Sequence, residues 1–332
     1  MQNTRRAADA SAETRAGPFL PPGFVLLVAV LALSWGGPLV RYATAPALVV
    51  AGWRVGFSVL LIAGLLLARG EAAALGRMSR KDWVLAVGAG LFLAGHFWTW
   101  IASLSYTTVA SSVVLVSTQP IFVALLSAWL LRERPSRRQW GGIAVAVAGA
   151  VIIGWGDFAG GVDPLLGDAL AVTGAILVSA YFVIGRRLRQ RLGIWPYTGV
   201  VYGVAAGALL GAAALMPGTR LTGYPGTDWL VFLALAVGPM LIGHTGINYA
   251  LRHVRAYVAN LAVLGEAIGA TLLAWWLPGI RERPSAQLLV GGALVLAGIA
   301  VGMRRRRVAK DSGPVRPWQS GPVRDKFERS DG

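Results

Sequence analysis

Residues 132–136 read RERPS, and residues 281–285 read RERPS again. Each copy precedes a Gly-Gly pair, at 141–142 and at 291–292, and each pair begins an apolar run of Ala, Val, Leu, Ile and Gly. Self-similarity at a fixed spacing is the signature of a repeated structural unit. The sequence therefore predicts two related halves, and this repeat decides the architecture.

A second correspondence sets the spacing and the extent of the repeat. Gln119-Pro120 stands 147 residues before Glu266-Ala267. This offset divides the chain into four predicted segments: a tail at 1–22, a first unit at 23–156, a second unit at 165–303 and a basic tail at 304–332.

The composition indicates a membrane protein. Of 332 residues, 55% are hydrophobic and 14% are charged, whereas a soluble domain carries about 25% charged residues. The mean hydropathy of +0.60 leaves too little polar surface for a soluble enzyme and excludes intrinsic disorder. The chain has no cysteine, which excludes a disulfide scaffold, an iron–sulfur site and a cysteine nucleophile.

The net charge of +16 would suit a nucleic-acid-binding protein, but such proteins carry their charge on one face of a folded domain. Here the basic residues form short clusters between apolar runs, where they set membrane topology. We therefore expect no nucleic-acid partner, and membrane lipid and a small-molecule substrate as partners of a monomer.

Ten apolar runs are long enough to cross the bilayer, which takes roughly 20 residues per helix. The all-α fold predicted from them has transmembrane helices at residues 23–40, 46–67, 83–104, 109–131, 140–155, 166–185, 197–216, 228–249, 256–277 and 288–303. With a cytoplasmic N-terminus, 26 of the 31 Arg and Lys residues fall in cytoplasmic segments, as the positive-inside rule requires.

Each repeated unit holds five spans, an odd number, so the second unit starts on the opposite side of the membrane. The two halves then form an inverted-topology repeat, with both termini cytoplasmic. Inverted halves are typical of transporters that work by alternating access, because the halves exchange conformations.

Several short motifs are spread over the two halves. They are Ser34-Trp35-Gly36-Gly37-Pro38, Arg54, Tyr106-Thr107-Thr108, Gln119-Pro120 and Glu133 before Gly141, and then Ala250-Leu251, Glu266 and Glu282 before Gly291. With the inverted five-span repeat, this pattern resembles the drug/metabolite transporter superfamily, in its ten-span EamA-like branch. Within that branch the chain is most similar to bacterial exporters of aromatic amino acids. Ala267 departs from the family, which often has proline there.

The resemblance implies a secondary transporter, not an enzyme, that exports small metabolites across the bacterial cytoplasmic (inner) membrane through a central cavity. Spans 1–4 and 6–9 would form the cavity, with spans 5 and 10 at its periphery. No cofactor is expected, since no glycine-rich phosphate loop, metal-binding motif or nucleophile elbow is present.

Span three carries the densest cluster of candidate substrate-binding residues. His96, Trp100 and Ser103 fall at i, i+4 and i+7, on one helix face. Imidazole and indole groups suit an aromatic substrate, by stacking and by hydrogen bonding. The alternative for Trp98 and Trp100 is a place in the aromatic belt at the membrane surface.

Other polar residues within spans are costly unless they face a cavity or a partner. His244 and Asn248, at i and i+4 in span eight, are candidates for binding the polar end of a substrate, or for helix–helix hydrogen bonds. Trp35 in span one and Tyr181 in span six are further candidates for the cavity wall.

Two charged residues lie within spans. Glu266, about ten residues into span nine, is a candidate proton or ammonium site, and its alternative is a hydrogen-bonded helix contact. Arg54, in span two, either attracts a carboxylate or has a structural role, reaching the surface or pinning helix ends.

Gly37, Pro38 and Pro120 are predicted to have structural or gating roles, since proline removes a backbone hydrogen bond and bends a helix. Two alternatives to amino-acid export remain. Proton-coupled efflux of cationic drugs would use Glu266, and a lipid-modifying intramembrane enzyme would need a nucleophile, a metal or a carboxylate pair, none of which the sequence offers.

Overall fold

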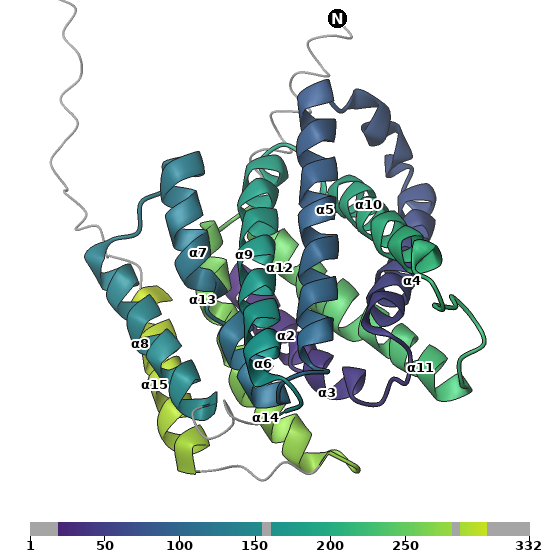
Figure 1. Cartoon of the computed structure of the whole chain (residues 1–332). Helices are drawn as coiled ribbons and strands as arrows, with labels where there is room; N and C mark the ends of the chain where they lie inside the picture. Colours follow the sequence, from purple (N-terminus) through teal and green to yellow (C-terminus); the bar gives the residue numbers. More distant parts are fainter. Residues whose placement is uncertain (1–18, 155–160, 281–285, 304–332) are drawn as a thin grey trace, which may run out of the picture.

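The computed structural model describes residues 19–154, 161–280 and 286–303, and all regular structure in them is helical (Figure 1). The second RERPS copy, most of the predicted N-terminal tail and the predicted C-terminal tail lie outside the described residues.

Eight stretches of helix in the described residues are long and apolar enough to cross a membrane. They are α2 with α3 (Pro22–Leu33, Gly36–Val40), α4 (Ala47–Ala68), α5 (Arg80–Ser103), α6 with α7 and the π-helix η2 (Val109–Val116, Gln119–Leu126, Ser127–Leu131), α9 (Pro164–Arg189), α10 (Ile194–Leu215), α11 with the π-helix η3 and α12 (Gly226–Leu235, Ala236–His244, Thr245–Ala250), and α13 with α14 (Ala256–Val263, Gly265–Trp276). A short 3-10 helix, η1 (Glu71–Arg77), follows α4.

The fifth and tenth predicted spans form α8 (Arg137–Gly154) and α15 (Ala286–Met303), which are not among those eight. Each has 18 residues, and α8 begins with a polar stretch, Arg137-Arg138-Gln139, which shortens its apolar part. The two helices pack along each other at one edge of the molecule (Figure 1). Their contact is close, because a Cβ built on Gly142 would lie only 2.7 Å from the backbone nitrogen of Gly302.

Two helix breaks and one change of helix type follow from proline, which has no N–H to donate to the carbonyl four residues earlier. Helix α6 ends at Val116, four residues before Pro120, and α11 passes without a gap into the π-helix η3 after Leu235, four residues before Pro239. In the first span, α2 ends at Leu33 and α3 begins at Gly36, around the Ser34 carbonyl that Pro38 leaves without a donor.

A third break occurs without proline. Helix α13 ends at Val263, 147 residues after the end of α6, although Ala267 stands where the first half has Pro120. Gly265, a poor helix former, begins the next helix. The departure from the family pattern at Ala267 therefore leaves the break in place.

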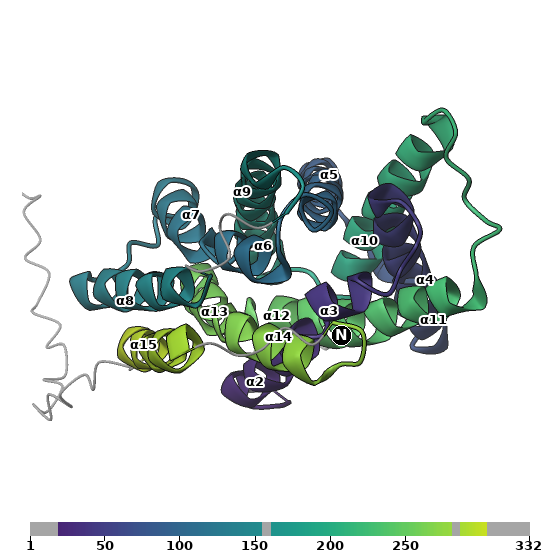
Figure 2. The ribbon, with the colours of Figure 1, turned by 60° about the horizontal axis from the view of Figure 1, so that its bottom comes forward.

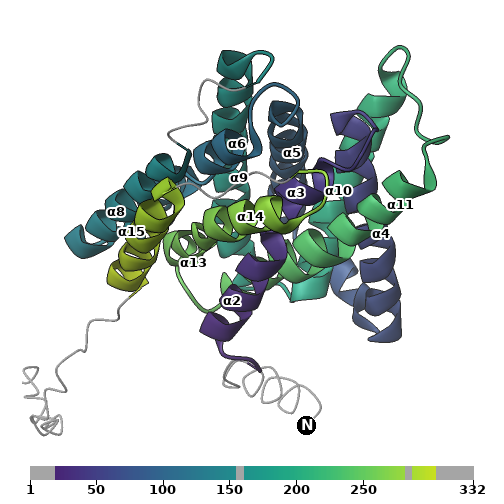
Figure 3. The same ribbon diagram turned by 90° about the horizontal axis from the view of Figure 1, so that it is seen from below.

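Helices from the two halves of the chain lie side by side. Helix α5 packs against α9, α4 against α10, and α2 against η3. Viewed toward one end, the helices form two layers, with α7, α9 and α5 on one side and α2, α12 and α14 on the other (Figure 2). Helices α8 and α15 lie at one edge, and α4, α10 and α11 at the opposite edge (Figures 2 and 3). The interior between the layers therefore receives side chains from both halves.

Candidate functional site

A cavity with an empty volume of about 420 Å³ lies between the layers. Its fourteen lining residues come equally from the two halves: Leu33, Gly36, Arg54, His96, Trp100, Val116 and Gln119, then Val178, Phe182, Pro239, His244, Ile247, Val263 and Glu266. Helices α8 and α15 contribute none of them. The cavity is therefore made jointly by both halves of the chain.

The cavity is narrow in this conformation. Its aromatic wall residues are packed in, with Trp100 at 5% and Phe182 at 1% exposed. An organic molecule therefore enters only if the helices around the cavity move apart.

Arg54 reaches the cavity from α4 and is 1% exposed. Its guanidinium carbon lies 4.2 Å from the centre of the Phe97 ring and 5.9 Å from that of Trp100. Within the described part of the chain, Nε and Nη1 of Arg54 have no hydrogen-bond partner. A buried guanidinium with free donors is costly unless an acceptor arrives.

Helix α5 presents His96 and Trp100 to the cavity, one turn apart, with their rings stacked at a centroid distance of 6.2 Å and an interplanar angle of 7°. His96 Nδ1 lies 2.9 Å from the carbonyl oxygen of Gly174 on α9. Because a carbonyl only accepts, Nδ1 carries the hydrogen and Nε2 is left as an acceptor. The indole Nε1 of Trp100 has no partner among the described residues.

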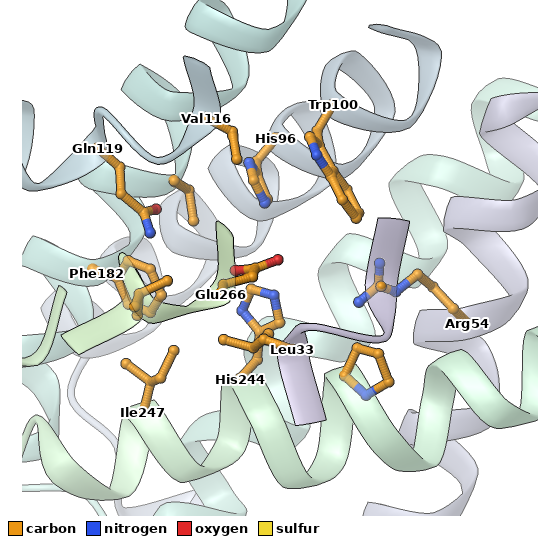
Figure 4. A pocket seen from close by; sticks show the side chains of 14 residues that line it. Leu33, Arg54, His96, Trp100, Val116, Gln119, Phe182, His244, Ile247 and Glu266 are labelled. Atoms are coloured by element: carbon orange, nitrogen blue, oxygen red, sulfur yellow. The ribbon is translucent and has the colours of Figure 1, made fainter. Parts of the chain in front are cut away.

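The second half contributes His244 from η3 and Glu266 from α14. The rings of His96 and His244 lie 6.2 Å apart at 60°. His244 and Glu266 both line the cavity, and in the view of Figure 4 they overlap near its middle, with Arg54 to one side. Among the described residues, no ion pair joins Arg54 to Glu266. The same part of the chain has no group of three His, Asp or Glu placed to hold a metal ion.

Behind His244 lies a second polar layer that does not line the cavity. Asn248 Nδ2 donates to the hydroxyl of Tyr181 and, at 3.3 Å, to that of Tyr202. Tyr202 in turn bonds Thr245 Oγ1 at 3.1 Å, and the Tyr181 ring lies 6.4 Å from His244. None of these hydrogen bonds involves His244, whose Nδ1 has no partner among the described residues.

The structure brings five of the predicted residues to the cavity: His96, Trp100, His244, Arg54 and Glu266. Three others are buried elsewhere, Tyr181 and Asn248 in the second layer and Ser103 in a 2.6 Å hydrogen bond to Ser112.

The remaining predicted residues lie off the cavity. Trp98 and Trp35 are 46% and 36% exposed and are not part of its wall. Gly37, Pro38 and Pro120 are buried at helix breaks.

Two polar or aromatic wall residues were not predicted, Gln119 and Phe182. Gln119 starts α7 and stands 147 residues before Glu266, and Phe182 stands 147 residues after Trp35. For Gln119 the repeat offset alone could have found the position, because its counterpart Glu266 was already singled out.

The model of the EamA-like transporter family matches residues 22–155 and 165–303. The chain is 28% identical over 256 residues to a protein named aromatic amino acid exporter YddG from Ancylobacter novellus, covering 74% of this chain and 83% of that one. It is also 30% identical over 239 residues to the cephamycin export protein CmcT of Amycolatopsis lactamdurans, covering 61% of this chain and 47% of that one.

A relative in Bacillus subtilis, the uncharacterized transporter YdfC, is 28% identical over 63% of this chain and 67% of its own. One solved crystal structure superposes with a TM-score of 0.70 at 22% identity, covering 85% of this chain and 97% of that chain. At that identity the structural likeness concerns the fold.

Proposed function

The chain belongs to the EamA-like transporter family, and we propose on this premise that it exports small amphipathic metabolites across a bacterial cytoplasmic membrane. Aromatic and other hydrophobic amino acids are the proposed substrates. The observation that carries the proposal is the cavity between the two halves, whose apolar walls hold a few polar groups from α4, α5, α7, η3 and α14. Sites of this kind bind small molecules in general.

The proposed architecture has ten spans, with five at residues 23–156 and five at 165–303, and both termini in the cytoplasm. Helices α8 and α15 are the proposed fifth and tenth spans, and at 18 residues each they would either stand upright in the bilayer or thin it slightly. The pairing of α5 with α9 and of α2 with η3 supports an inverted repeat, since each pair joins spans of opposite halves in a reciprocal way, third with sixth and first with eighth.

Transport would proceed by alternating access, with the cavity opening to one side at a time. One end of the cavity is held together beyond Phe182 by Arg186 of α9. Arg186 Nη2 lies 3.0 Å from Glu133, and its Nη1 donates to the carbonyl oxygen of Leu251 at 2.6 Å. By the charge distribution this is the cytoplasmic end, and export would require these contacts to open.

Amino-acid export is favoured over proton-coupled efflux of cationic drugs because Arg54 lines the same cavity as Glu266. A permanent cation in this narrow space would lie close to a buried guanidinium, and like charges repel strongly at low dielectric. A lipid-modifying enzyme gains no support from the cavity, which has neither a hydroxyl nucleophile nor a carboxylate pair on its wall.

Counterflow in proteoliposomes tests the proposal. Vesicles containing the purified protein are loaded with unlabelled tryptophan and diluted into labelled tryptophan, with leucine, alanine and a quaternary ammonium dye as competitors. We expect transient accumulation of label that aromatic amino acids compete for, without an imposed pH gradient. Absence of tryptophan exchange, together with dye flux that needs a pH gradient, would contradict the proposal and favour cation antiport.

A further inference from the structure

We propose that the cavity recognises the two charged ends of a zwitterion separately, with Arg54 and Trp100 binding the carboxylate and Glu266 and His96 binding the ammonium group. This inference rests on the proposed function and narrows it to substrates that carry both groups.

The carboxylate end of the site is defined by donors that have no acceptor. Arg54 and Trp100 are both more than nine-tenths buried and both line the cavity. Nε and Nη1 of Arg54 and Nε1 of Trp100 are free of partners among the described residues. Phe97 covers one face of the guanidinium at 4.2 Å and leaves the N–H groups in the guanidinium plane open to a carboxylate. Arginine binds a carboxylate with two parallel hydrogen bonds, which explains why a lysine would serve less well.

The ammonium end is defined by acceptors. Glu266 offers a carboxylate, and His96, whose Nδ1 is committed to the Gly174 carbonyl, offers Nε2. An ammonium group has three donors and no acceptor, so it is suited to both. His96, Glu266 and Arg54 all line this one cavity, and Figure 4 shows Arg54 to one side of the other two.

The rest of the wall is apolar and suits the side chain of the substrate. Val116, Val178, Phe182, Ile247 and Val263 surround the polar groups. The formal charges of Arg54 and Glu266 cancel, so a bound zwitterion leaves every buried charge paired. An amine without a carboxylate leaves Arg54 unpaired, and an acid without an ammonium leaves Glu266 unpaired, each at a large cost.

The test compares three probes that share the indole ring: tryptophan, tryptamine and indole-3-propionate. Each unlabelled probe competes with labelled tryptophan in counterflow. For the unmodified protein, we expect tryptamine and indole-3-propionate to compete at least about 30-fold more weakly than tryptophan, the loss typical of one unpaired buried charge.

Two charge-neutralising variants then separate the two ends of the site. Arg54→Gln is expected to bring tryptamine to within about threefold of tryptophan, and Glu266→Gln to do the same for indole-3-propionate, because each removes the group that the analogue fails to pair. Arg69→Gln, an exposed change outside the cavity, is the matched control and keeps the selectivity of the unmodified protein. If either neutralised variant fails to fold, Arg54→Lys is used and is expected to retain selectivity against tryptamine with weaker tryptophan exchange.

The outcomes distinguish this inference from the proposed function. If tryptophan exchanges and either analogue competes equally well in the unmodified protein, the two-ended site is wrong and amino-acid export stands. If no amino acid exchanges at all, the proposed function itself is wrong.

Discussion

A carboxylate oxygen of Asp228, Oδ2, lies 2.9 Å from the backbone nitrogen of Ala45, a residue 183 positions earlier in the chain. The same carboxylate accepts from the backbone N–H of Thr44, at 3.1 Å, and from its hydroxyl, at 3.0 Å. Asp228 is the third residue of α11, and Asp82, the third residue of α5, pairs with Arg191 at 2.9 Å. In both places a helix start in one half holds the loop that follows the first span of the other half.

The first prediction concerns Asp228. We expect Asp228→Ala to destabilise the protein by about 2 kcal/mol or more, because the loop at Thr44 and Ala45 loses its charged acceptor while its N–H groups stay partly buried. Asp228→Asn retains one acceptor oxygen, so its stability should lie between that of the unmodified protein and that of Asp228→Ala. Thermal unfolding in detergent measures the differences.

Glu71→Ala serves as the control for Asp228, because within the described residues the side chain of Glu71 forms a single exposed ion pair, with Arg69, and such pairs contribute little. An equal fall in melting temperature for both alanine variants would show that the Asp228 contacts contribute no more to stability than an exposed ion pair does.

A second prediction uses two adjacent glycines of α8. A Cβ on Gly142 would lie 2.7 Å from Gly302 N and 2.8 Å from Gly298 O, both backbone atoms of α15, whereas nothing lies within 4 Å of a Cβ on Gly141. We expect Gly142→Ala to force α8 and α15 apart at a cost of about 1–3 kcal/mol, and Gly141→Ala to be neutral or slightly stabilising. Thermal unfolding of the two variants provides the comparison, and similar melting temperatures would mean that the α8–α15 contact is looser than these distances imply.

The third prediction separates two tryptophans of α5. Trp100 lines the cavity, while Trp98 is 46% exposed on another face of the helix. We expect Trp100→Leu to lower tryptophan counterflow at least about tenfold, the effect of losing roughly 1.4 kcal/mol, and Trp98→Leu to leave it unchanged. Loss of exchange in the Trp98 variant, with normal yield and stability, would place the substrate on the outer face of α5.

A fourth prediction tests the topology. The chain has no cysteine, so a single introduced cysteine is the only thiol available for labelling. Ala73 in η1 lies between α4 and α5, and Thr222 lies between α10 and α11, where it is exposed. The positive-inside rule predicts that Ala73 lies in the cytoplasm and Thr222 outside.

In intact cells, a membrane-impermeant maleimide should therefore label Thr222→Cys at once and Ala73→Cys only after permeabilisation. The cysteine-free parent is the control. Labelling of both positions in intact cells, or the reverse pattern, would contradict an inverted repeat with cytoplasmic termini.

The membrane class, the helical secondary structure and the family all follow from the sequence alone. Burial of a helix in lipid depends on the hydropathy of about 20 consecutive residues, and this is a local property. The repeat offset is equally visible in the sequence, and it relates Gln119 to Glu266. Because charged and polar residues inside spans are rare and costly, Arg54, His96, His244 and Glu266 stand out in the sequence as candidate site residues.

The packing of the helices decides which of these side chains share one cavity and which find partners elsewhere. Ser103 lies on the expected face of α5 but bonds Ser112, and Asn248 lies one turn from His244 but bonds two tyrosines. The rotation of each helix and the course of the broken helices around Val116 and Val263 depend on contacts between residues far apart in the sequence. Hydropathy does not distinguish a buried polar group that faces a cavity from one that faces a neighbouring helix, because the difference lies in the packing of elements from both halves.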